Sequence, residues 1–210
     1  MIKVLIADDH ALFRDGLRLI IGETSDITVA AEAESGRDAI KKMRECKWDV
    51  ALLDLNMPDI SGLEVLKRIT TQDITCRILA LSMYPEEEYA IRAIRSGASG
   101  YLAKDAPTDK LIAVIRRLAE GGKYISPALA EKLLFNPVSD SSALPHVTFS
   151  DRELHVFKLI ASGKSLTEIA NMLSISNKTV STYRSRILKK MNMENNAQLT
   201  RYSIQHNLIE

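Results

Sequence analysis

The sequence predicts two domains: an α/β domain built on a parallel sheet, followed by a small all-α domain that contains a helix-turn-helix. In residues 1–122, short apolar runs of strand length alternate with stretches whose apolar residues recur at helical spacing. Residues 123–147 contain a short helical run and then several Pro and Ser residues, a composition typical of a linker. From residue 148 to residue 210 the apolar period is helical throughout.

Five strand–helix units are expected in the first domain. The strands are predicted at residues 2–7, 28–33, 50–54, 77–82 and 101–103. Helical spacing follows each of them, after residue 9 and at about residues 35–44, 62–69, 86–96 and 108–120. Alternation of this kind gives a parallel sheet with helices on both faces. By analogy with flavodoxin-like folds, the strand order 2-1-3-4-5 places the first and third strands side by side.

Carboxylates stand at the ends of these two strands. The first strand ends in Asp8-Asp9, and the third, which is apolar and bounded by turn formers, ends at Asp54. An isolated Asp in such a place usually caps the next turn. Three carboxylates brought together instead form a pocket of hard oxygen ligands that suits Mg²⁺ and leaves room for phosphate oxygens.

Several of these strand-end residues match one family in order along the chain. They resemble the receiver domain of two-component response regulators, and the matching residues are Asp8-Asp9, Asp54, Met57-Pro58, Gly62, Ser82 and Lys104. The resemblance covers residues 1–122. One departure is that Asp105 follows Lys104, where many receivers have a proline, often after a cis bond.

The resemblance implies a site of phosphoryl transfer. Asp54 would accept the phosphoryl group, and Mg²⁺ would be held by Asp9, Asp54 and the backbone carbonyl of Asn56, with Asp8 acting partly through water. The ion and a cation are needed because negative phosphoryl oxygens approach a negative carboxylate. The remaining family roles are a compensating cation at Lys104, a hydroxyl that hydrogen-bonds the phosphoryl group at Ser82, and an aromatic switch at Tyr101.

Four helices are expected in the second domain. Ser150 with Glu153 and Ser165 with Glu168 fit capping boxes, which open helices that run to about residue 161 and over residues 166–173. Ser176 is expected to cap a third helix over residues 177–191, and a fourth follows at about 196–206. The short turn at 174–176 between the second and third helices fits a helix-turn-helix.

The third of these helices has two different faces. Val180, Ile187 and Met191, with Tyr183 at the margin, form a stripe that faces a small core. The opposite face carries hydroxyls and cations suited to the major groove of DNA, although an ordinary solvated face has a similar pattern. The candidate DNA-binding residues are Lys178, Thr179, Ser181, Thr182, Ser185, Arg186 and Lys189.

Residues 148–210 also resemble the LuxR-type helix-turn-helix of NarL/FixJ-type regulators. The matching residues are Ser150, Arg152-Glu153, Gly163, Ile169-Ala170, Leu173, those at 176–180, Ile187 and Lys190. This chain has Tyr183 where the family commonly has His three residues after the Val, so a strict copy of the backbone contacts is not expected there.

Composition and charge narrow the function classes. No run of about 18 apolar residues occurs and the N-terminus enters strand pattern at once, so no membrane span is expected and the location is predicted to be cytoplasmic.

Cys46 and Cys76 lack metal-ligand spacing and are expected to be buried free thiols. Residues 1–122 carry 17 Lys and Arg against 20 Asp and Glu, whereas residues 146–210 carry nine against five, which favours a polyanionic partner for the second domain.

The expected function is that of a transcription regulator and not of an enzyme. A sensor histidine kinase or a small phosphodonor would phosphorylate Asp54, and the new state would favour a homodimer that binds double-stranded DNA. One alternative is a DNA-binding regulator that is independent of phosphorylation and has a structural receiver. Another is a phosphatase with an aspartyl-phosphate intermediate, but such enzymes usually carry a second Asp where this chain has Asn56. The resemblance gives His10 no chemical role.

Overall fold

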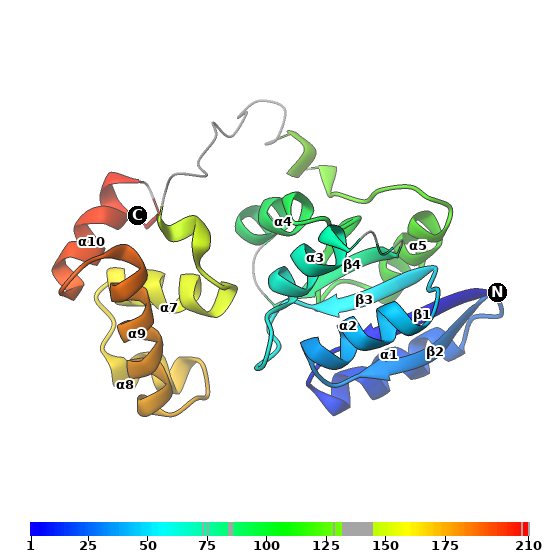
Figure 1. Cartoon of the computed structure of the whole chain (residues 1–210), viewed down its shortest axis with the longest axis horizontal. Helices are drawn as coiled ribbons and strands as arrows, with labels where there is room; N and C mark the ends of the chain where they lie inside the picture. Colours follow the sequence, from blue (N-terminus) through cyan, green and yellow to red (C-terminus); the bar gives the residue numbers. More distant parts are fainter. Residues whose placement is uncertain are drawn as a thin grey trace. The chain divides into compact units, whose positions relative to one another are not determined.

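The chain divides into two compact units, Met1–Pro137 and Val138–Glu210, an α/β unit and a helical unit (Figure 1). The computed structural model describes residues 1–72, 74, 76–83, 86–127, 129–131, 145–206 and 208–209. Of the linker expected at 123–147, the structure describes residues 123–127, 129–131 and 145–147, and the rest lies outside the described residues. In the short helical run expected there, residues 127 and 129–131 are helical.

The first unit is built on a five-stranded parallel sheet. Its strands lie in the order β2-β1-β3-β4-β5, which confirms the flavodoxin-like topology. The elements in chain order are β1 (Ile2–Ala7), α1 (Ala11–Gly22), β2 (Ile27–Ala33), α2 (Gly36–Glu45), β3 (Val50–Asp54), α3 (Gly62–Thr71), β4 (Arg77–Ser82), α4 (Glu86–Arg95), β5 (Gly100–Ala103) and α5 (Thr108–Ala119).

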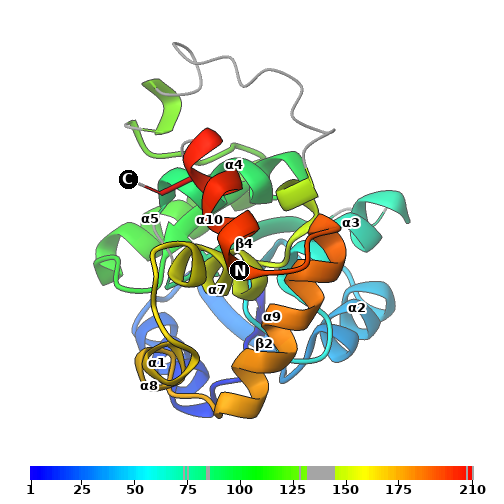
Figure 2. The same cartoon turned by 90° about the vertical axis from the view of Figure 1, so that its left-hand side faces the viewer.

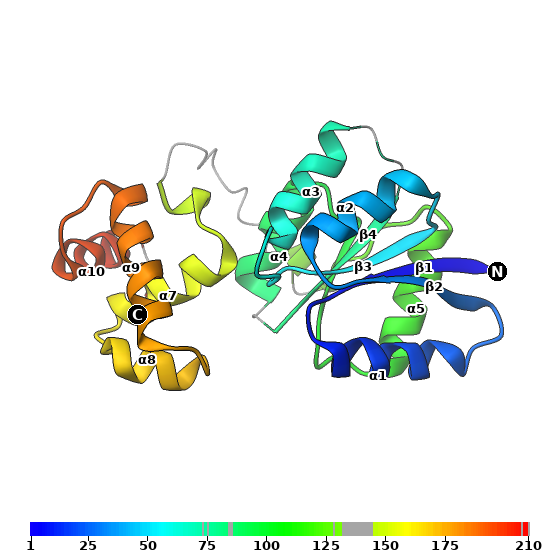
Figure 3. The same cartoon turned by 60° about the horizontal axis from the view of Figure 1, so that its bottom comes forward.

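Helices cover both faces of this sheet. Figure 3 shows α1 and α5 on one face and α2, α3 and α4 on the other. Every residue of β3 is buried, because the side chains of a central strand in a doubly covered sheet pack against helices on both sides. Toward α1 and α5, alternate strand residues pack against apolar helix residues that include Leu17, Ile21, Val114 and Ile115. Each such buried side chain stabilises the fold by about 1.5–3 kcal/mol relative to an exposed one.

The loop between β3 and α3 is held from two directions. The Asp59 carboxylate accepts hydrogen bonds from the backbone N–H groups of Gly36 (2.8 Å) and Arg37 (3.0 Å), which fastens the loop to the start of α2. At the other end, Gly62 begins α3 so close to β3 that a Cβ atom there would collide with the carbonyl oxygen of Asp54. The backbone that follows Asp54 is therefore fixed by contacts at both ends of the loop.

The second unit consists of short helices. They are η2 (Pro145–Thr148), α7 (Asp151–Ala161), α8 (Leu166–Met172), α9 (Asn177–Met191) and α10 (Asn196–Gln205). Both expected capping boxes are present, Ser150 with Glu153 and Ser165 with Glu168. In Figure 2, α8 is seen end-on while α9 lies across the view, as expected for a helix-turn-helix. Among the described residues of either unit, no helix combines the length and apolar character needed to cross a membrane.

Aromatic packing and the ion pair between Glu153 and Lys190 stabilise the second unit. The rings of Phe149 and Phe157 pack edge to face, with centroids 5.4 Å apart. The buried Glu153 carboxylate accepts a hydrogen bond of 2.8 Å from the backbone N–H of Ser150 and is ion-paired with the Lys190 ammonium at 2.6 Å. Glu153 thus caps α7 and also anchors the C-terminal half of α9.

The two cysteines differ in exposure. The expectation that both are buried is wrong for Cys46, which is the C-cap residue of α2 and is exposed, because the helix ends there at the surface. Cys76 is partly buried just before β4, and burial raises the pKa of its thiol to about 12. Both thiols are free, as predicted.

Candidate functional site

The first and third strands bring two carboxylates side by side. Because Ala7 lies opposite Leu53 in the β1–β3 pair, Asp8 and Asp54 come next to each other at the carboxyl edge of the sheet. Only 1% of each of these acidic residues is exposed. Two carboxylates buried in one place repel each other, so this arrangement requires a positive charge nearby.

Lys104 supplies such a charge. It follows β5, and its backbone N–H donates a hydrogen bond of 2.9 Å to the carbonyl oxygen of Ser82 at the end of β4. Its ammonium nitrogen lies 2.7 Å from Oδ2 of Asp8 and 2.9 Å from Oδ2 of Asp54. From α1, the ring of Phe13 covers the ammonium, whose nitrogen is 4.6 Å from the ring centroid. The predicted convergence of these strand ends is therefore present.

Burial and charge act in opposite directions on the Asp54 carboxyl. Burial raises its pKa, the Lys104 ammonium lowers it and the neighbouring Asp8 raises it again, and the net result is a raised pKa. The backbone N–H of Asn56 donates a hydrogen bond of 3.1 Å to Oδ1 of Asp54 and favours the charged form. Additional positive charge at this edge would therefore stabilise the Asp54 carboxylate.

Four buried side-chain oxygens at this edge accept no hydrogen bond from the described residues. They are Oδ2 of Asp8, Oδ1 of Asp9, Oδ2 of Asp54 and Oδ1 of Asn56, although the first and third are ion-paired with Lys104 and Oδ1 of Asp9 lies 3.0 Å from Nδ1 of His10. Ligand atoms of Asp8, Asp9, Asp54 and His10 all lie within 4.8 Å of one another. A set of close oxygen ligands with unused lone pairs fits a hard divalent cation such as Mg²⁺.

His10 lies at the rim of this cluster. Its ring Nδ1 is 3.3 Å from Oδ1 of Asp8 and 3.0 Å from Oδ1 of Asp9, and 59% of its side chain is exposed. Its backbone N–H also donates a hydrogen bond of 2.9 Å to Oδ1 of Asp8. The residue for which the sequence implied no role therefore contacts both members of the acid pair.

Arg14 was not among the residues predicted from the sequence. It is buried in α1, with 6% of the residue exposed. Its guanidinium donates a hydrogen bond of 2.8 Å to the backbone carbonyl oxygen of Asp8 and is ion-paired with Glu32 at 3.1 Å and Glu34 at 2.8 Å. The sequence did contain one signal for this role. Arg14 stands three residues before Leu17 on the apolar stripe of α1, and a charged residue on an apolar stripe needs partners for its charge.

Ser82 and Tyr101 are both fully buried. Ser82 ends β4, the strand next to the one that ends at Asp54. Tyr101 belongs to β5, and because the following Leu102 packs on the side of α1 and α5, alternation along the strand turns Tyr101 toward the opposite face. The tyrosine side chain is therefore buried inside the domain. Tyr101 stands two residues before Ala103, which pairs with Ser82 at the carboxyl edge of the sheet.

Helix α9 separates a buried stripe from an exposed face. The buried residues are Val180, Ile187, Leu188 and Met191, of which Leu188 was not predicted. Among the candidate DNA-binding residues, Thr179 is half-buried, whereas the exposed ones are Lys178, Ser181, Thr182, Ser185, Arg186 and Lys189. The cations and hydroxyls of this face are therefore accessible on one helix.

The hydroxyl groups on the exposed face of α9 differ in their partners. Thr182 donates a hydrogen bond of 2.9 Å to the carbonyl oxygen of Lys178, and Ser185 donates one of 3.0 Å to that of Ser181. The Ser181 side chain makes no hydrogen bond with the part of the chain that the structure describes. Ser181 thus offers a donor and acceptors to a ligand, whereas Thr182 and Ser185 offer chiefly acceptors.

An open α/β sheet whose edge gathers three carboxylates and a lysine, followed in the same chain by a helix-turn-helix, defines a signal-receiving domain combined with a DNA-binding domain. Two protein families match these parts: the response regulator receiver domain at residues 4–116, and the luxR family of bacterial regulatory proteins at residues 147–203. The chain belongs to the response regulators of the NarL/FixJ type, which are DNA-binding transcription regulators of two-component systems.

Similarity to known response regulators extends over almost the whole chain. It is 34% identical to the response regulator UvrY of Escherichia coli (strain K12), over 99% of this chain and 96% of UvrY. The crystal structure of the response regulator ChrA of a heme-sensing two-component system has a TM-score of 0.53 and 31% identity, covering 99% of this chain and 98% of ChrA. A structure of the Salmonella typhimurium RcsB response regulator, concerned with DNA interaction, has a TM-score of 0.57 and 26% identity, covering 96% and 97%.

Proposed function

We propose that Asp54 accepts a phosphoryl group and that this modification activates DNA binding. The observation that carries the proposal is the Lys104 ammonium, which is ion-paired with both buried carboxylates at distances of 2.7 and 2.9 Å. A bond forms between a carboxylate oxygen of Asp54 and phosphorus, while the bond from phosphorus to the donor breaks and its electrons leave with the donor. Lys104 offsets the negative charge that gathers on the phosphoryl oxygens.

Mg²⁺ is the proposed cofactor. The residues that would hold it are Asp9, Asp54 and the backbone carbonyl of Asn56, with Asp8 acting partly through water; ligand atoms of Asp8, Asp9 and Asp54 that lie within 4.8 Å of one another support this. When bound, the ion supplies positive charge between the carboxylates and the phosphoryl oxygens. The chain's own contribution is to hold the acid pair, through the hydrogen bond from Arg14 to the Asp8 backbone.

Two buried residues are proposed to transmit the modification. Ser82 would donate its hydroxyl hydrogen bond to a phosphoryl oxygen, because it ends the strand beside Asp54. Tyr101 would act as the aromatic switch, since it is buried on the adjacent strand β5 and faces away from α1 and α5. A shift of Ser82 would therefore change how Tyr101 packs on the face of the sheet covered by α4. Two alternative positions of these side chains would give the receiver two conformational states through which to transmit the signal.

Helix α9 is proposed to lie in the major groove of double-stranded DNA. The residues assigned to contacts are Lys178, Thr179, Ser181, Thr182, Ser185, Arg186 and Lys189. Their exposure on one helix face and the helix-turn-helix that positions it support the assignment. The long cationic side chains would contact phosphates, and the short hydroxyls would contact base edges.

The remaining parts of the proposal concern partners and organisation. A sensor histidine kinase or a small phosphodonor would supply the phosphoryl group, and the phosphorylated chain would form a homodimer on paired half-sites. The proposed limits are 1–122 for the receiver, 123–147 for the linker and 148–210 for the DNA-binding domain, in a cytoplasmic protein. Asn56 argues against a phosphatase. The Lys104 ion pairs argue against a purely structural receiver, because buried charges are costly to retain.

Phosphorylation by acetyl phosphate tests the proposal directly. Intact-mass and peptide-mapping measurements are expected to show one Mg²⁺-dependent adduct on Asp54, absent in Asp54→Ala and reduced in Asp9→Ala. Asp15→Ala, which removes an exposed acid on α1, is the matched control and keeps the adduct. Unchanged labelling of Asp54→Ala would refute the assignment.

Sedimentation and DNA binding, each measured with and without beryllofluoride, test the activation step. A dimer and tighter DNA binding are expected with the phosphoryl mimic. Equal DNA binding in both states would favour the regulator that does not depend on phosphorylation.

A further inference from the structure

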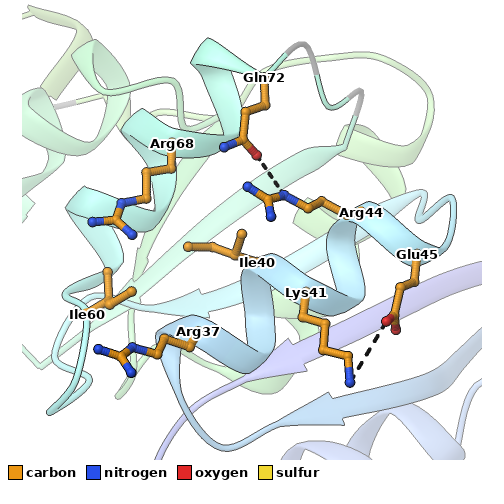
Figure 4. A pocket seen from close by; sticks show the side chains of 8 residues that line it. All are labelled: Arg37, Ile40, Lys41, Arg44, Glu45, Ile60, Arg68 and Gln72. Atoms are coloured by element: carbon orange, nitrogen blue, oxygen red, sulfur yellow. Dashed lines mark hydrogen bonds and ion pairs between the residues drawn. The ribbon is translucent and has the colours of Figure 1, made fainter.

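A basic groove lies between α2 and α3, on the face of the sheet away from α1 and α5. Its volume is about 830 Å³, which is within the range of small-ligand sites. Figure 4 shows the residues that line it, with arginines from both helices around two isoleucine side chains. The residues used in the argument are Arg37, Ile40, Arg44, Ile60, Arg68 and Gln72.

Glu45 also lines the groove, where its carboxylate lies 3.9 Å from the Lys41 ammonium, but the arginines keep donors that are paired with no carboxylate of the described residues. Arg44 uses Nε to donate a hydrogen bond of 2.8 Å to the neutral side-chain amide of Gln72, which holds the guanidinium between α2 and α3 (Figure 4). Arg68 uses Nε for Glu64 at 2.9 Å. Within the described residues, the Arg37 side chain makes no hydrogen bond or ion pair. The groove therefore offers several guanidinium N–H groups to an anion.

Helix dipoles explain only part of this charge. Arg44 and Arg68 stand in the last turns of α2 and α3, where a cation is favourable. Arg37 stands in the first turn of α2, where a cation is unfavourable. An anion bound in the groove accounts for all three positions, whereas the dipoles account for two.

The apolar floor indicates what kind of anion fits. Ile40 is buried and Ile60 half-buried, and in Figure 4 both lie among the guanidinium groups. We propose that the groove binds a nucleotide with two or more phosphoryl groups, its base against the two isoleucines and its phosphoryl oxygens on the arginines. A polyglutamate peptide has no flat ring for the floor, and duplex DNA keeps its base faces stacked inside the helix.

Calorimetric titration of the full chain with ATP, GTP and inorganic tripolyphosphate tests this proposal. The titrations contain EDTA, so that metal-bridged binding at the acidic edge of the sheet is absent. One nucleoside triphosphate is expected to bind at least fivefold more tightly than tripolyphosphate, which lacks a base. Arg44→Gln and Arg68→Gln are each expected to weaken its binding about tenfold, because one charge-assisted hydrogen bond is lost.

A matched control is available on the opposite face. Arg117→Gln makes the same change in charge at an exposed position of α5 and is expected to leave the affinity unchanged. Thermal melting of each variant verifies that these surface substitutions leave the fold intact. The measurement uses no phosphoryl transfer, so its failure leaves the proposed function of Asp54 untouched.

Five outcomes would overturn the proposal. Three of them are no nucleotide binding at millimolar concentration, equal affinity for tripolyphosphate, and equal losses in Arg44→Gln and Arg117→Gln. Tighter binding of a polyglutamate peptide, titrated in the same way, would assign the groove to an acidic protein segment. Loss of nucleotide binding in Lys178→Ala, with no loss in Arg44→Gln, would place the nucleotide on α9 instead.

Discussion

The guanidinium of Arg14 donates a hydrogen bond of 2.8 Å to the backbone carbonyl oxygen of Asp8, in the interior of the receiver. It thereby fixes the backbone of the acid pair from α1, while Lys104 holds the Asp8 side chain. Residues that hold metal ligands without binding the metal typically change affinity 10–100-fold when they are replaced. Arg14 therefore acts as a positioning residue for the proposed Mg²⁺ site.

Arg14→Gln is expected to weaken Mg²⁺ binding about tenfold and to slow phosphorylation of Asp54. Calorimetric titration with Mg²⁺, together with labelling by acetyl phosphate, measures both effects. Arg18→Gln is the control, because Arg18 is ion-paired with the same Glu32 at 2.9 Å. Similar Mg²⁺ affinities in the two variants would show that the Asp8 contact has no such role.

Gly62→Ala is expected to destabilise the receiver by about 1–3 kcal/mol, because the new Cβ atom would collide with the carbonyl oxygen of Asp54. Gly16→Ala makes the same substitution in α1, where nothing lies within 4 Å of the added atom. That variant is expected to be more stable by about 0.5–1 kcal/mol. Urea unfolding of both variants measures the difference, and changes of the same sign would contradict the steric argument.

Asp59→Asn is expected to lower stability at pH 7 but not in acid. Burial raises the pKa of Asp59, but hydrogen bonds from the backbone N–H groups of Ile60, Arg37 and Gly36 lower it by more, so the folded pKa is below its usual range. A carboxyl with a lowered folded pKa stabilises the fold above its unfolded pKa of about 4, and that stability is lost as pH falls through the folded value.

The expected loss at neutral pH is at most about 1 kcal/mol, because Asp59 is exposed and solvent screens its charge. Urea unfolding of the parent chain and of Asp59→Asn at pH 7, 5, 4 and 3 checks the pH dependence. The difference between the two proteins is expected to shrink below about pH 4. A difference that stays constant across this range would mean that the carboxylate charge is not the cause.

Lys178→Ala is expected to weaken binding to all DNA sequences alike. If Lys178 contacts a phosphate, its removal lowers by about 1 the slope of log affinity against log salt concentration, because one fewer counterion is released. Binding to a preferred and a scrambled duplex across a salt series measures this slope. Lys164→Ala, an exposed cation outside α9, is the control, and an equal change there would contradict the assignment.

Ser181→Ala is expected to cost about 1–3 kcal/mol on the preferred DNA site and little on scrambled DNA. The reason is that Ser181 has both a donor and acceptors available, whereas the Ser185 hydroxyl already donates to the helix backbone. Ser185→Ala is accordingly expected to have the smaller effect. If Ser181→Ala weakened both duplexes equally, α9 would not read bases through this residue.

The carboxyl-edge site was largely predictable from the sequence, because each of its members directly follows or ends a strand. Apolar runs locate the strands, and strands in a parallel sheet end at a common edge. The strand order, and with it the convergence of Asp8 and Asp54, came from fold analogy, and the role of Lys104 came from the resemblance to receiver domains. The helix starts of the DNA-binding domain were also predictable, since the capping boxes at Ser150 and Ser165 depend on residues only three positions away.

Features that depend on packing between elements were not predictable in the same way. Arg14 is recognisable only when α1 is seen beside β2, which carries its partner Glu32. The basic groove combines Arg37 of α2 with Arg68 of α3, and neither helix shows it alone. Cys46 was expected to be buried on composition, but its exposure depends on where α2 ends. The spacing of apolar residues along one helix or strand does not indicate which other helix or strand packs against it.

The ion pairs of Lys104 also bear on the order in which the receiver folds. Asp8 and Asp54 lie on β1 and β3, whereas the lysine follows β5, the last strand to leave the ribosome. Until that strand is added, pairing of β1 with β3 buries two like charges without a cation, which opposes a stable partial sheet. Docking of β5 removes this penalty, so the sheet is expected to close in one cooperative step.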